Sequence, residues 1–398
     1  MGWEVKKLSS LCTLFTDGDW IESKNQSSSG IRLIQTGNVG EGVFKNRKKK
    51  ARYISDETLT KLKCTEIFSG DCLISRLPDP VGRACVLPEL KDRAITAVDC
   101  TILRFNDDLI INDYFKYYSQ SNSYLVDISS RCSGATRKRI SRKNLGETLI
   151  PVPSLEEQKK IVAILDQAFA EIDKARANAE QNLNNARELF DSYLNQVFSQ
   201  RGEGWEEKKL GDVCELVGGG TPSKANDEYY GGNIPWATVR DMGKDYLRET
   251  EHTITEAGLS NSSTKLIPSN EIVIATRVGL GKVCILGQST AINQDLKGVI
   301  PKSDNVLDRQ YLFWWFKSKA KYIESEGTGA TVKGVKIPFI KSLSISLPDI
   351  TKQKYIANNL REASEQVVNL KQTLEQKILN LEELKKSILQ KAFSGELT

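Results

Sequence analysis

The sequence has little of what most metal and redox sites require. His252 is the only histidine, and the eight cysteines form no Cys-x-x-Cys pair. Protein zinc sites draw several ligands from these residue types at short, regular spacing. The sequence therefore gives no support for a zinc site, and we expect the cysteines to be reduced residues that pack in the interior.

Long apolar runs are missing as well. No segment of the 398 residues approaches the ~20 consecutive apolar residues that a membrane-spanning helix needs. Residues 1–7, Met-Gly-Trp-Glu-Val-Lys-Lys, also lack the basic and then apolar order of a secretory signal. We therefore expect a cytoplasmic protein that makes no membrane contact.

Motifs of nucleic-acid enzymes are largely absent. The sequence contains no Asp/Asn-Pro-Pro-aromatic segment, which adenine methyltransferases use to hold a flipped base. Gly279-Leu280-Gly281-Lys282 does not complete a Walker loop, because Thr276 and Val283 occupy two of its fixed positions. We therefore predict a chain without catalytic activity and without a bound cofactor.

One acidic cluster keeps a catalytic alternative open. Asp79, Glu89 and Lys91 follow the acidic-plus-lysine order of metal-dependent nucleases, in which carboxylates hold Mg²⁺. Two proline turns that flank a strand explain the same residues more simply. A self-sufficient nuclease is the weaker hypothesis.

The sequence consists of two copies of one unit. Gly2–Leu8 returns as Gly204–Leu210, and Ser133–Ile140 returns as Thr328–Val335. Between these anchors, Ser75-Arg76 resembles Thr276-Arg277. A chain of this length is expected to form two or more domains, and the repeat indicates where they divide.

The order of the repeat suggests a cyclic arrangement. Val197-Phe198-Ser199 leads into the second Gly-Trp-Glu segment, whereas the matching Ala392-Phe393-Ser394 is followed by only four residues. The missing continuation is the N-terminal segment itself. We expect the last helix to return beside residue 1, which gives an approximate two-fold axis within one chain.

Two long helices are predicted, from Leu155 to about Ser199 and from about Ile350 to Ser394. Both stretches lack proline and glycine and are rich in helix-forming residues. Their apolar residues follow the alternating spacing of three and four that forms a coiled-coil seam, so we expect the two helices to pack antiparallel against each other. The predicted seam comprises Ile172, Ala175, Ala179, Ala186, Leu189 and Tyr193 in the first helix and Val367, Leu370, Leu374, Leu381, Leu384 and Ile388 in the second.

Two polar residues interrupt the seams at equivalent places. Asn182 and Lys377 could fix the register as buried polar residues, or they could lie at a solvated edge. About 45 helical residues would form a rod of about 65 Å that separates the two globular parts. A pair of helices that only dimerises the protein is the simpler alternative.

Two basic clusters stand out in the first globular part, which otherwise reads as short strands with a few helices. Residues 45–52 carry six basic side chains, and residues 131–143 carry six basic side chains and no acidic one. Such clusters are typical of phosphate neutralisation, although a charge run is more often only a solvated face. Gly134 and Thr136 lie in the second cluster, in a predicted loop whose backbone N–H and hydroxyl can meet phosphate; a glycine turn before the strand that leads into the helix is the alternative.

These features together resemble the DNA specificity subunits of type I restriction-modification systems. The resemblance covers the full length and rests on Gly219-Gly220-Thr221-Pro222-Ser223-Lys224, Ile234–Asp241, Ser133–Thr136 and the two Pro-x-x-x-x-Gln helix openings at Pro153/Gln158 and Pro348/Gln353. The first copy departs from the pattern, because Leu33–Val39 stands where the second copy has its Pro-Trp segment. Its contact residues are correspondingly harder to assign.

The resemblance implies an α+β protein with two mixed target recognition domains joined by two long antiparallel coiled-coil helices. We place the first recognition domain at residues 1–153, the central spacer helix at 154–200, the second recognition domain at 201–348 and the C-terminal spacer helix at 349–398. Each recognition domain would read half of a split DNA site, with half-site centres about 34 Å apart. The chain itself would not catalyse a reaction.

The implied partners are double-stranded DNA, two modification (methyltransferase) subunits and motor-nuclease restriction subunits. S-adenosylmethionine, ATP and Mg²⁺ would bind to those subunits. A coiled-coil scaffold with protein-binding globular ends is the main alternative from another class. The candidate DNA contacts are Thr36, Asn38, Arg76, Arg83, Thr136, Arg137, Lys138 and Arg139 in the first copy and Lys224, Thr238, Arg240, Arg277, Lys282, Thr331 and Lys333 in the second.

Overall fold

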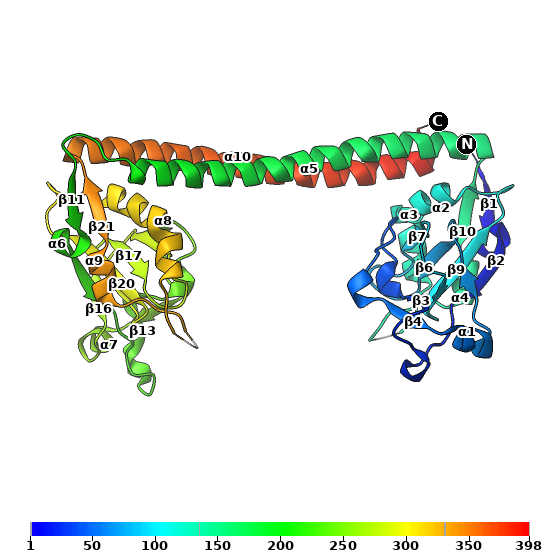
Figure 1. The fold of residues 1–398 in the computed structure, drawn as a ribbon, viewed down its shortest axis with the longest axis horizontal. Helices are drawn as coiled ribbons and strands as arrows, with labels where there is room; N and C mark the ends of the chain where they lie inside the picture. The colour runs from blue at the N-terminus through cyan, green and yellow to red at the C-terminus, as the bar shows by residue number, and fades with distance from the viewer. Residues whose placement is uncertain (1, 135, 330–331, 398) are drawn as a thin grey trace. The chain divides into compact units, whose positions relative to one another are not determined.

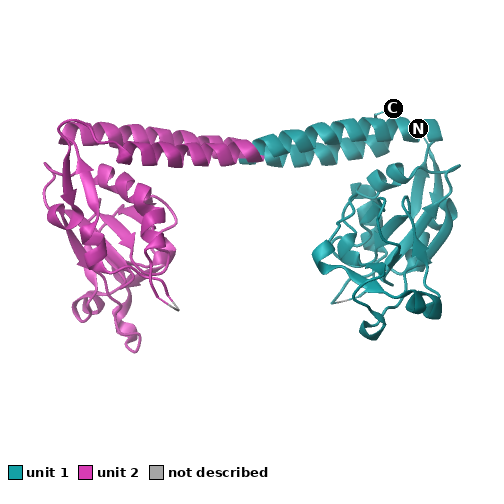
Figure 2. Ribbon diagram, in the orientation of Figure 1, with its two compact units in different colours: residues 1–179, 375–398 teal, residues 180–374 magenta. Residues whose placement is uncertain are grey.

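The computed structural model describes residues 2–134, 136–329 and 332–397. The chain divides into two compact units, which Figure 2 colours separately: residues 1–179 with 375–398 form unit 1, and residues 180–374 form unit 2. Both ends of the chain therefore belong to unit 1. There the ring of Phe393 packs edge-on against Tyr114 with the centroids 5.5 Å apart. Trp3 packs in the same apolar core as Leu389 and Phe393, which confirms the predicted return of the last helix to the N-terminal segment.

Two four-stranded sheets and one strand pair build the globular part of unit 1 (Figure 1). One sheet has the antiparallel order β2-β9-β6-β7, and the other has the order β4-β3-β8-β5, in which β3 and β8 run parallel. The strand pair joins β1 to β10. The strands are β1 Glu4–Lys7, β2 Cys12–Asp17, β3 Ile31–Ile34, β4 Arg52–Ile54, β5 Glu66–Ile67, β6 Cys72–Ser75, β7 Ala84–Val86, β8 Ala94–Thr96, β9 Cys100–Phe105 and β10 Leu149–Val152; the short helices are η1 Leu8–Leu11, η2 Ser23–Asn25, η3 Thr36–Asn38, η4 Lys48–Lys50, α1 Asp56–Leu62, α2 Asn112–Tyr118, α3 Asn122–Ser130 and α4 Arg142–Gly146.

Unit 2 repeats this topology and adds one edge strand. Its sheets have the orders β12-β20-β17-β18-β14 and β15-β13-β19-β16, and the strand pair joins β11 to β21. Strand β17, Ile272–Ala275, is buried along its whole length. The strands are β11 Glu206–Lys209, β12 Cys214–Gly218, β13 Tyr230–Ala237, β14 Tyr246–Leu247, β15 His252–Ile254, β16 Lys265–Ile267, β17 Ile272–Ala275, β18 Val283–Leu286, β19 Thr290–Ile292, β20 Leu296–Pro301 and β21 Ser344–Leu347; the short helices are α6 Leu210–Val213, η5 Asp227–Tyr229, η6 Val239–Asp241, α7 Glu256–Ser260, α8 Arg309–Ser325 and α9 Ile337–Ser342.

The Gly-Trp-Glu repeats have a structural role in both units. The residues that follow each Gly-Trp form β1 and β11, which pair antiparallel with the strand that precedes a long helix. In each unit a buried tyrosine of a neighbouring helix, α2 or α8, hydrogen-bonds the strand that precedes the long helix, β10 or β21. The hydroxyl of Tyr114 donates to the carbonyl of Pro151 at 2.9 Å, and that of Tyr311 donates to Ser346 at 2.7 Å.

The two Pro-x-x-x-x-Gln motifs anchor the long helices to the globular parts. Gln158 and Gln353 are only 0% and 1% exposed. The Gln158 amide donates to the carbonyls of Pro153 and Leu109 and accepts from the Ile111 backbone. Gln353 makes the equivalent bonds to Pro348, Val306 and Asp308. A buried amide needs all of its partners, so each glutamine fixes the helix start to a specific loop.

The long helices are α5, Leu155–Ser199, and α10, Ile350–Ser394, as predicted. Within unit 1 their halves run antiparallel, because Asp173 pairs with Lys385 at 3.6 Å while Arg176 pairs with Glu382 at 3.4 Å. Within unit 2, Leu194 of α5 shares one apolar core with Leu360 of α10. No helix in the described ranges combines the length and apolar character that a membrane crossing requires.

The predicted seam needs a correction along part of both helices. Ile172, Ala179 and Leu374 are buried as expected, but Leu189 is 72% exposed and Leu384 is 46% exposed. Leu194 and Leu389 are buried instead of the predicted Tyr193 and Ile388. An α-helix drifts by ~20° per heptad from a strict 3.5-residue repeat, so over two to three heptads the inward face rotates by roughly 40–60°, towards the neighbouring residue. Asn182 and Lys377 are exposed, which supports their reading as solvated edge residues.

Candidate nucleic-acid interface

Three segments form the same edge in each unit. They are the 3-10 turn (η3 Thr36–Asn38 or η6 Val239–Asp241), the strand turn (residues 97–99 or 293–295) and the described residues of the glycine loop (133–134 and 136–139, or 328–329 and 332–334). The backbone N–H of Ala97 donates to Ile34 at 2.8 Å, and that of Asn293 donates to Ala237 at 3.0 Å. These equivalent bonds hold the strand turn beside the 3-10 turn in both units.

The glycine loop closes on itself in both units. Ser133 and Arg139 exchange two backbone hydrogen bonds of 2.9 Å, and Thr328 and Gly334 exchange equivalent bonds of 3.0 and 2.9 Å. Gly134 has a φ of +104°, and a Cβ there would lie 2.4 Å from the carbonyl oxygen of Arg137. Only glycine fits such a position without strain. The glycine therefore shapes the turn, and the side chains of Thr136, Arg137, Lys138 and Arg139 stay exposed.

The residue that follows β6 or β17 hydrogen-bonds both the glycine loop and the strand turn. These bonds correct one alignment made from the sequence. In unit 1, Ile140 N donates to the Arg76 carbonyl and Arg76 N donates to Asp99. In unit 2, Val335 N donates to Thr276 and Thr276 N donates to Asp295. Arg76 therefore corresponds to Thr276, one residue earlier than the sequence match to Arg277.

This shift of one residue gives the two arginines different environments. Arg76 is 4% exposed, lies 3.3 Å from the Asp17 carboxylate and donates to the Val98 carbonyl at 2.5 Å. Burial lowers the pKa of Arg76, and Asp17 opposes this shift. The Arg277 side chain is 54% exposed and lies 3.7 Å from Asp295. Arg76 is thus part of the framework, whereas Arg277 can reach a ligand.

A basic residue tethers the 3-10 turn in each unit. Arg83 is 8% exposed and donates to four backbone carbonyls, those of Thr36, Val39, Leu77 and Pro80, at 2.7–3.0 Å. Among the described residues, the side chain of Lys282, its counterpart, has only the Val239 carbonyl within reach, at 3.4 Å. Thr36 and Val239 are both the first residue of their turn. Arg83 thus holds two loops in place through main-chain bonds.

Capping residues close both 3-10 turns and align them. Asn38 is 8% exposed; its Oδ1 accepts from Gln35 N and its Nδ2 donates to Lys45. Asp241 accepts equivalently from Thr238 N at 2.7 Å. The structural counterpart of Thr238 is therefore Gln35. The half-buried Thr36 corresponds to Val239, and its carbonyl is bound by Arg83.

A pocket of about 740 Å³ in unit 2 brings three predicted residues together. Lys224, Thr238 and Arg240 line it, and the Arg240 side chain is 83% exposed. The sequence interpretation missed the rest of the lining. These further residues are Thr221, Tyr230, Trp236, Val239, His252, Val278, Asn293, Gln294 and Asp295.

One signal could have found part of this missed set. Asn293, Gln294 and Asp295 directly follow the short apolar strand β19, a common place for functional polar residues. His252 begins β15, whose counterpart in unit 1 is β4. Because Ile54 and Ile254 hold equivalent places in these strands, Arg52 of the first basic cluster corresponds to His252.

A smaller pocket in unit 1, of about 470 Å³, gathers part of the predicted glycine loop. Thr136, Arg137 and Lys138 line it together with Asp79 and the prolines on either side of Asp79. Glu89 and Lys91 are not among its lining residues. Within residues 2–134, 136–329 and 332–397, no group of three or more His, Cys, Asp or Glu side chains could hold a metal ion.

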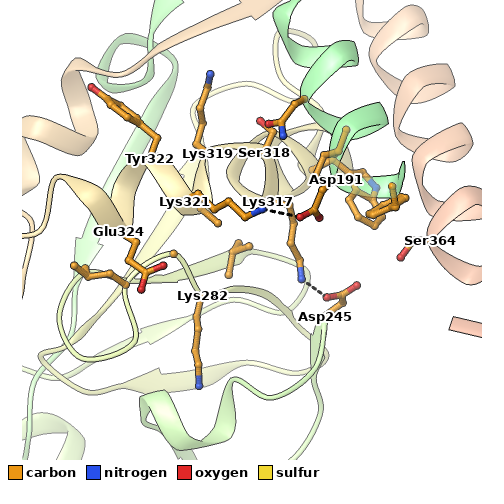
Figure 3. Close-up of a pocket in the computed structure, with 18 of the residues that line it drawn as sticks. Asp191, Asp245, Lys282, Lys317, Ser318, Lys319, Lys321, Tyr322, Glu324 and Ser364 are labelled. Carbon is orange, nitrogen blue, oxygen red and sulfur yellow. Dashed lines mark hydrogen bonds and ion pairs between the residues drawn. The ribbon is translucent and has the colours of Figure 1, made fainter. Parts of the chain in front are cut away.

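Lys282 also lines a second cavity of unit 2, of about 730 Å³, which Figure 3 shows. Lys317 and Lys321 reach aspartates there, with Lys317 Nζ 2.5 Å from Asp245 and Lys321 Nζ 2.8 Å from Asp191. These ion pairs neutralise much of the local positive charge. Of the remaining predicted residues, Lys333 is exposed, and Thr331 lies outside the described residues.

Comparison with known proteins identifies the family. The sequence model of one protein family, the type I restriction modification DNA specificity domain, matches residues 1–181 and again residues 202–380. The chain belongs to this family. The two matches correspond to the two copies of the internal repeat.

Named relatives and a solved structure agree with this result. The specificity subunit of the type I restriction enzyme EcoR124I/EcoR124II from Escherichia coli is 32% identical over 60% of this chain and 61% of its own length. The MjaIX specificity subunit from Methanocaldococcus jannaschii is 33% identical over 42% of this chain and 39% of its own length. These two alignments thus span less than two thirds of each relative. A chain solved in work on assembly of the type I R-M system has a TM-score of 0.80 at 19% identity, covering 99% of this chain and 98% of the other, which establishes the shared fold.

Proposed function

We propose that this chain is the sequence-reading subunit of a type I restriction-modification complex. Each unit reads one half of a bipartite double-stranded DNA site with the edge formed by its 3-10 turn, strand turn and glycine loop. The long helices set the spacing between the half-sites. The chain directs other subunits to the site and does not itself catalyse methylation or cleavage.

One observation carries this proposal: a single framework is used twice with different exposed side chains. Equivalent main-chain bonds hold the three segments of each edge, yet the pocket of unit 2 presents Arg240 and His252 where unit 1 has Gly37 and Arg52. Direct readout of DNA depends on the side chains that reach base edges. A constant frame with variable side chains suits two readers of different sequences.

The exposed cations suit phosphate contacts in this proposal. Arg137 and Lys138 in unit 1, and Lys224, Arg240 and Lys333 in unit 2, are all exposed on or next to the reading edge. Arg76, Arg83 and Asn38 take a different role from the one expected of them, because their polar atoms already bind the protein. They position the reading segments.

The partners in this proposal are two methyltransferase subunits and the motor-nuclease subunits, which supply S-adenosylmethionine, ATP and Mg²⁺ sites. An apolar groove on the helix pair of unit 2 supports a docked subunit. It has a volume of about 430 Å³ and is lined by residues that include the exposed Leu189, Tyr193 and Leu370. Exposed apolar patches of this kind are typical of protein interfaces.

Methylome mapping tests the proposal. The chain and its methyltransferase subunits are expressed in a host that lacks other type I systems, and every methylated adenine is mapped. The expected result is one split motif, with two short defined halves and an unspecified gap. A contiguous motif, or no new methylation with folded subunits, would contradict the proposal.

Two further measurements address the alternatives. A DNA footprint of the complex should show two protected patches with a gap between them, which a protein-binding scaffold would not give. The purified chain with Mg²⁺ should leave DNA intact. Cleavage that is lost in Asp79→Ala would favour the nuclease instead.

A further inference from the structure

In each unit two positions lie side by side, one in the strand turn of the reading edge and one in the segment hydrogen-bonded next to it. Asp19 N donates to Thr96 at 2.8 Å in unit 1, and Gly220 N donates to Ile292 at 2.9 Å in unit 2. The residues that follow, Trp20 and Thr221, are therefore equivalent. The strand turn supplies the second position, because Ala97 matches Asn293 and so Val98 matches Gln294.

Direct contacts join the two positions. In unit 2 the Thr221 hydroxyl donates a hydrogen bond to Oε1 of Gln294, and both residues line the 740 Å³ pocket. In unit 1 the Val98 N–H donates to the Asp19 carbonyl at 3.0 Å, which sets Val98 beside the Asp19–Trp20 peptide. The equivalent positions thus hold a polar pair in unit 2 and an apolar pair in unit 1.

A glycine lets the chain pass close to the strand turn in both units. A Cβ on Gly18 would lie 2.4 Å from the carbonyl oxygens of Thr96 and Ala97, and one on Gly219 would lie 2.1 Å from that of Asn293. Neither backbone can move aside without breaking sheet bonds. The pair therefore sits on a rigid base, which suits discrimination between ligands that differ by a few atoms.

We propose that this pair discriminates bases: Thr221 and Gln294 select an adenine in the half-site of unit 2, and Trp20 and Val98 select a thymine in that of unit 1. The inference rests on the proposed function. It assigns a reading role to four residues and a base to each of two positions.

The chemistry of unit 2 suits adenine. A glutamine amide pairs with adenine by donating to N7 and accepting from the N6 amino group. Oε1 of Gln294 accepts from Thr221 and has a second lone pair, and no acceptor for its Nε2 occurs among the described residues. The hydroxyl of Thr221 thereby orders an exposed amide before DNA binds, which reduces the entropy lost on binding.

The chemistry of unit 1 suits the thymine methyl group. Trp20 is 71% exposed, an unusual state for the largest apolar side chain, and Val98 is half-buried, with its N–H bound to the carbonyl of the preceding Asp19. Thymine is the base that carries a methyl group in the major groove, and apolar side chains read it by contact. The exposed cation Arg52 lies on the neighbouring β4 and can bind phosphate.

The first test changes one atom of the amide. In the complete methyltransferase complex, Gln294→Glu replaces the NH₂ donor by an oxygen, which accepts from the amino group of cytosine. We expect preference at one position of one half-site to move from adenine towards cytosine, by about tenfold or more in relative methylation. The other half-site should stay unchanged. Gln288→Glu, at the opposite end of β19, is the matched control and should leave the motif intact.

Variants of Thr221 separate reading from folding. Thr221→Ser keeps the hydroxyl and should keep the motif, whereas Thr221→Val should weaken discrimination at the same position as Gln294→Glu. An equal loss of methylation at all sites for both Gln294→Glu and Thr221→Val would mean a merely structural role and overturn the inference. A change in the half-site read by unit 1 would do so as well.

The second test removes only the methyl group. Deoxyuridine replaces each thymine of the unit 1 half-site in turn, and binding of the complex is measured. We expect a loss of about three- to fivefold at one thymine, the value of one buried methyl group, and no such loss in Trp20→Ala.

Binding that ignores every deoxyuridine would refute the assignment of unit 1. A wild-type complex that yields no split motif would instead contradict the proposed function. The two failures are therefore distinguishable.

Discussion

Unit 1 and unit 2 share a framework but stabilise it by different means. Arg83 donates to four backbone carbonyls in unit 1, whereas its counterpart Lys282 reaches one in unit 2. The helix layer differs too, since α2 and α3 of unit 1 occupy the place of the single helix α8. Main-chain bonds define the shared frame, so side chains can differ widely without changing the fold.

The break between α2 and α3 has a simple cause. From Tyr114 to Ser133 the chain advances 19 positions, whereas from the equivalent Tyr311 to Thr328 it advances 17. Unit 1 must accommodate two extra residues between fixed points. Ser121 accepts from Tyr124 N and caps the new helix start, which makes the break stable.

The largest expected difference between the units comes from removing the basic side chains that hold the 3-10 turns, Arg83 in unit 1 and Lys282 in unit 2. Arg83→Ala should lower the free energy of unfolding by about 3 kcal/mol, because four buried carbonyls lose a charged donor. Lys282→Ala should change it by less than about 0.5 kcal/mol. Urea unfolding of the full-length chain measures both. Equal effects would show that the two turns are held alike.

Arg76 and Arg277, which the sequence match paired although they are not structural equivalents, should give the next largest difference in stability. Arg76→Ala should lower the free energy of unfolding by about 2 kcal/mol, since it removes the buried donor of the Val98 carbonyl and the cation that pairs with Asp17. Arg277→Ala should leave stability unchanged and weaken DNA binding by the complex. Thermal unfolding and DNA titration of the two variants distinguish these outcomes. If Arg277→Ala destabilised the fold as Arg76→Ala does, the two arginines would be equivalent, as the sequence match has them.

The glycine loops differ in charge and should differ in their response to salt. Arg137→Ala with Arg139→Ala should reduce the slope of log affinity against log salt by about 2, and Lys333→Ala should reduce it by about 1. DNA affinity of the complex is measured at several salt concentrations. Lys159→Ala, an exposed lysine on α5, is the control. An unchanged slope for the double variant would remove the unit 1 loop from the interface.

The smallest expected difference between the two units is in the reactivity of their cysteine thiols. Burial raises the pKa of Cys214 and of Cys284 to about 12, so both thiols of unit 2 stay protonated at pH 8. Unit 1 also has Cys132, which is only partly buried. We expect iodoacetamide at pH 8 to label unit 1 first, at Cys132, and unit 2 only after unfolding. Peptide mass spectrometry of the native chain checks this order, and early labelling of Cys284 would contradict it.

Some elements could be predicted because their signals are local. The two 45-residue helices follow from composition and spacing, and the Gly134 and Gly329 loops follow from a repeated motif. The residues that meet at the reading edge could not be predicted from local signals. Thr221 and Gln294 are 73 positions apart, and only the sheet order brings them together.

The sequence by itself determined the duplication, the two helices and the cyclic order, because repeats and helical periodicity are properties of neighbouring residues. Only the tertiary structure decided which basic residues are available to a ligand. Arg76 and Arg83 look like DNA contacts in the sequence, but they are buried among main-chain carbonyls at 4% and 8% exposure. A one-residue offset at a strand end moves a side chain from solvent to interior, and strand pairing over long separations sets that offset.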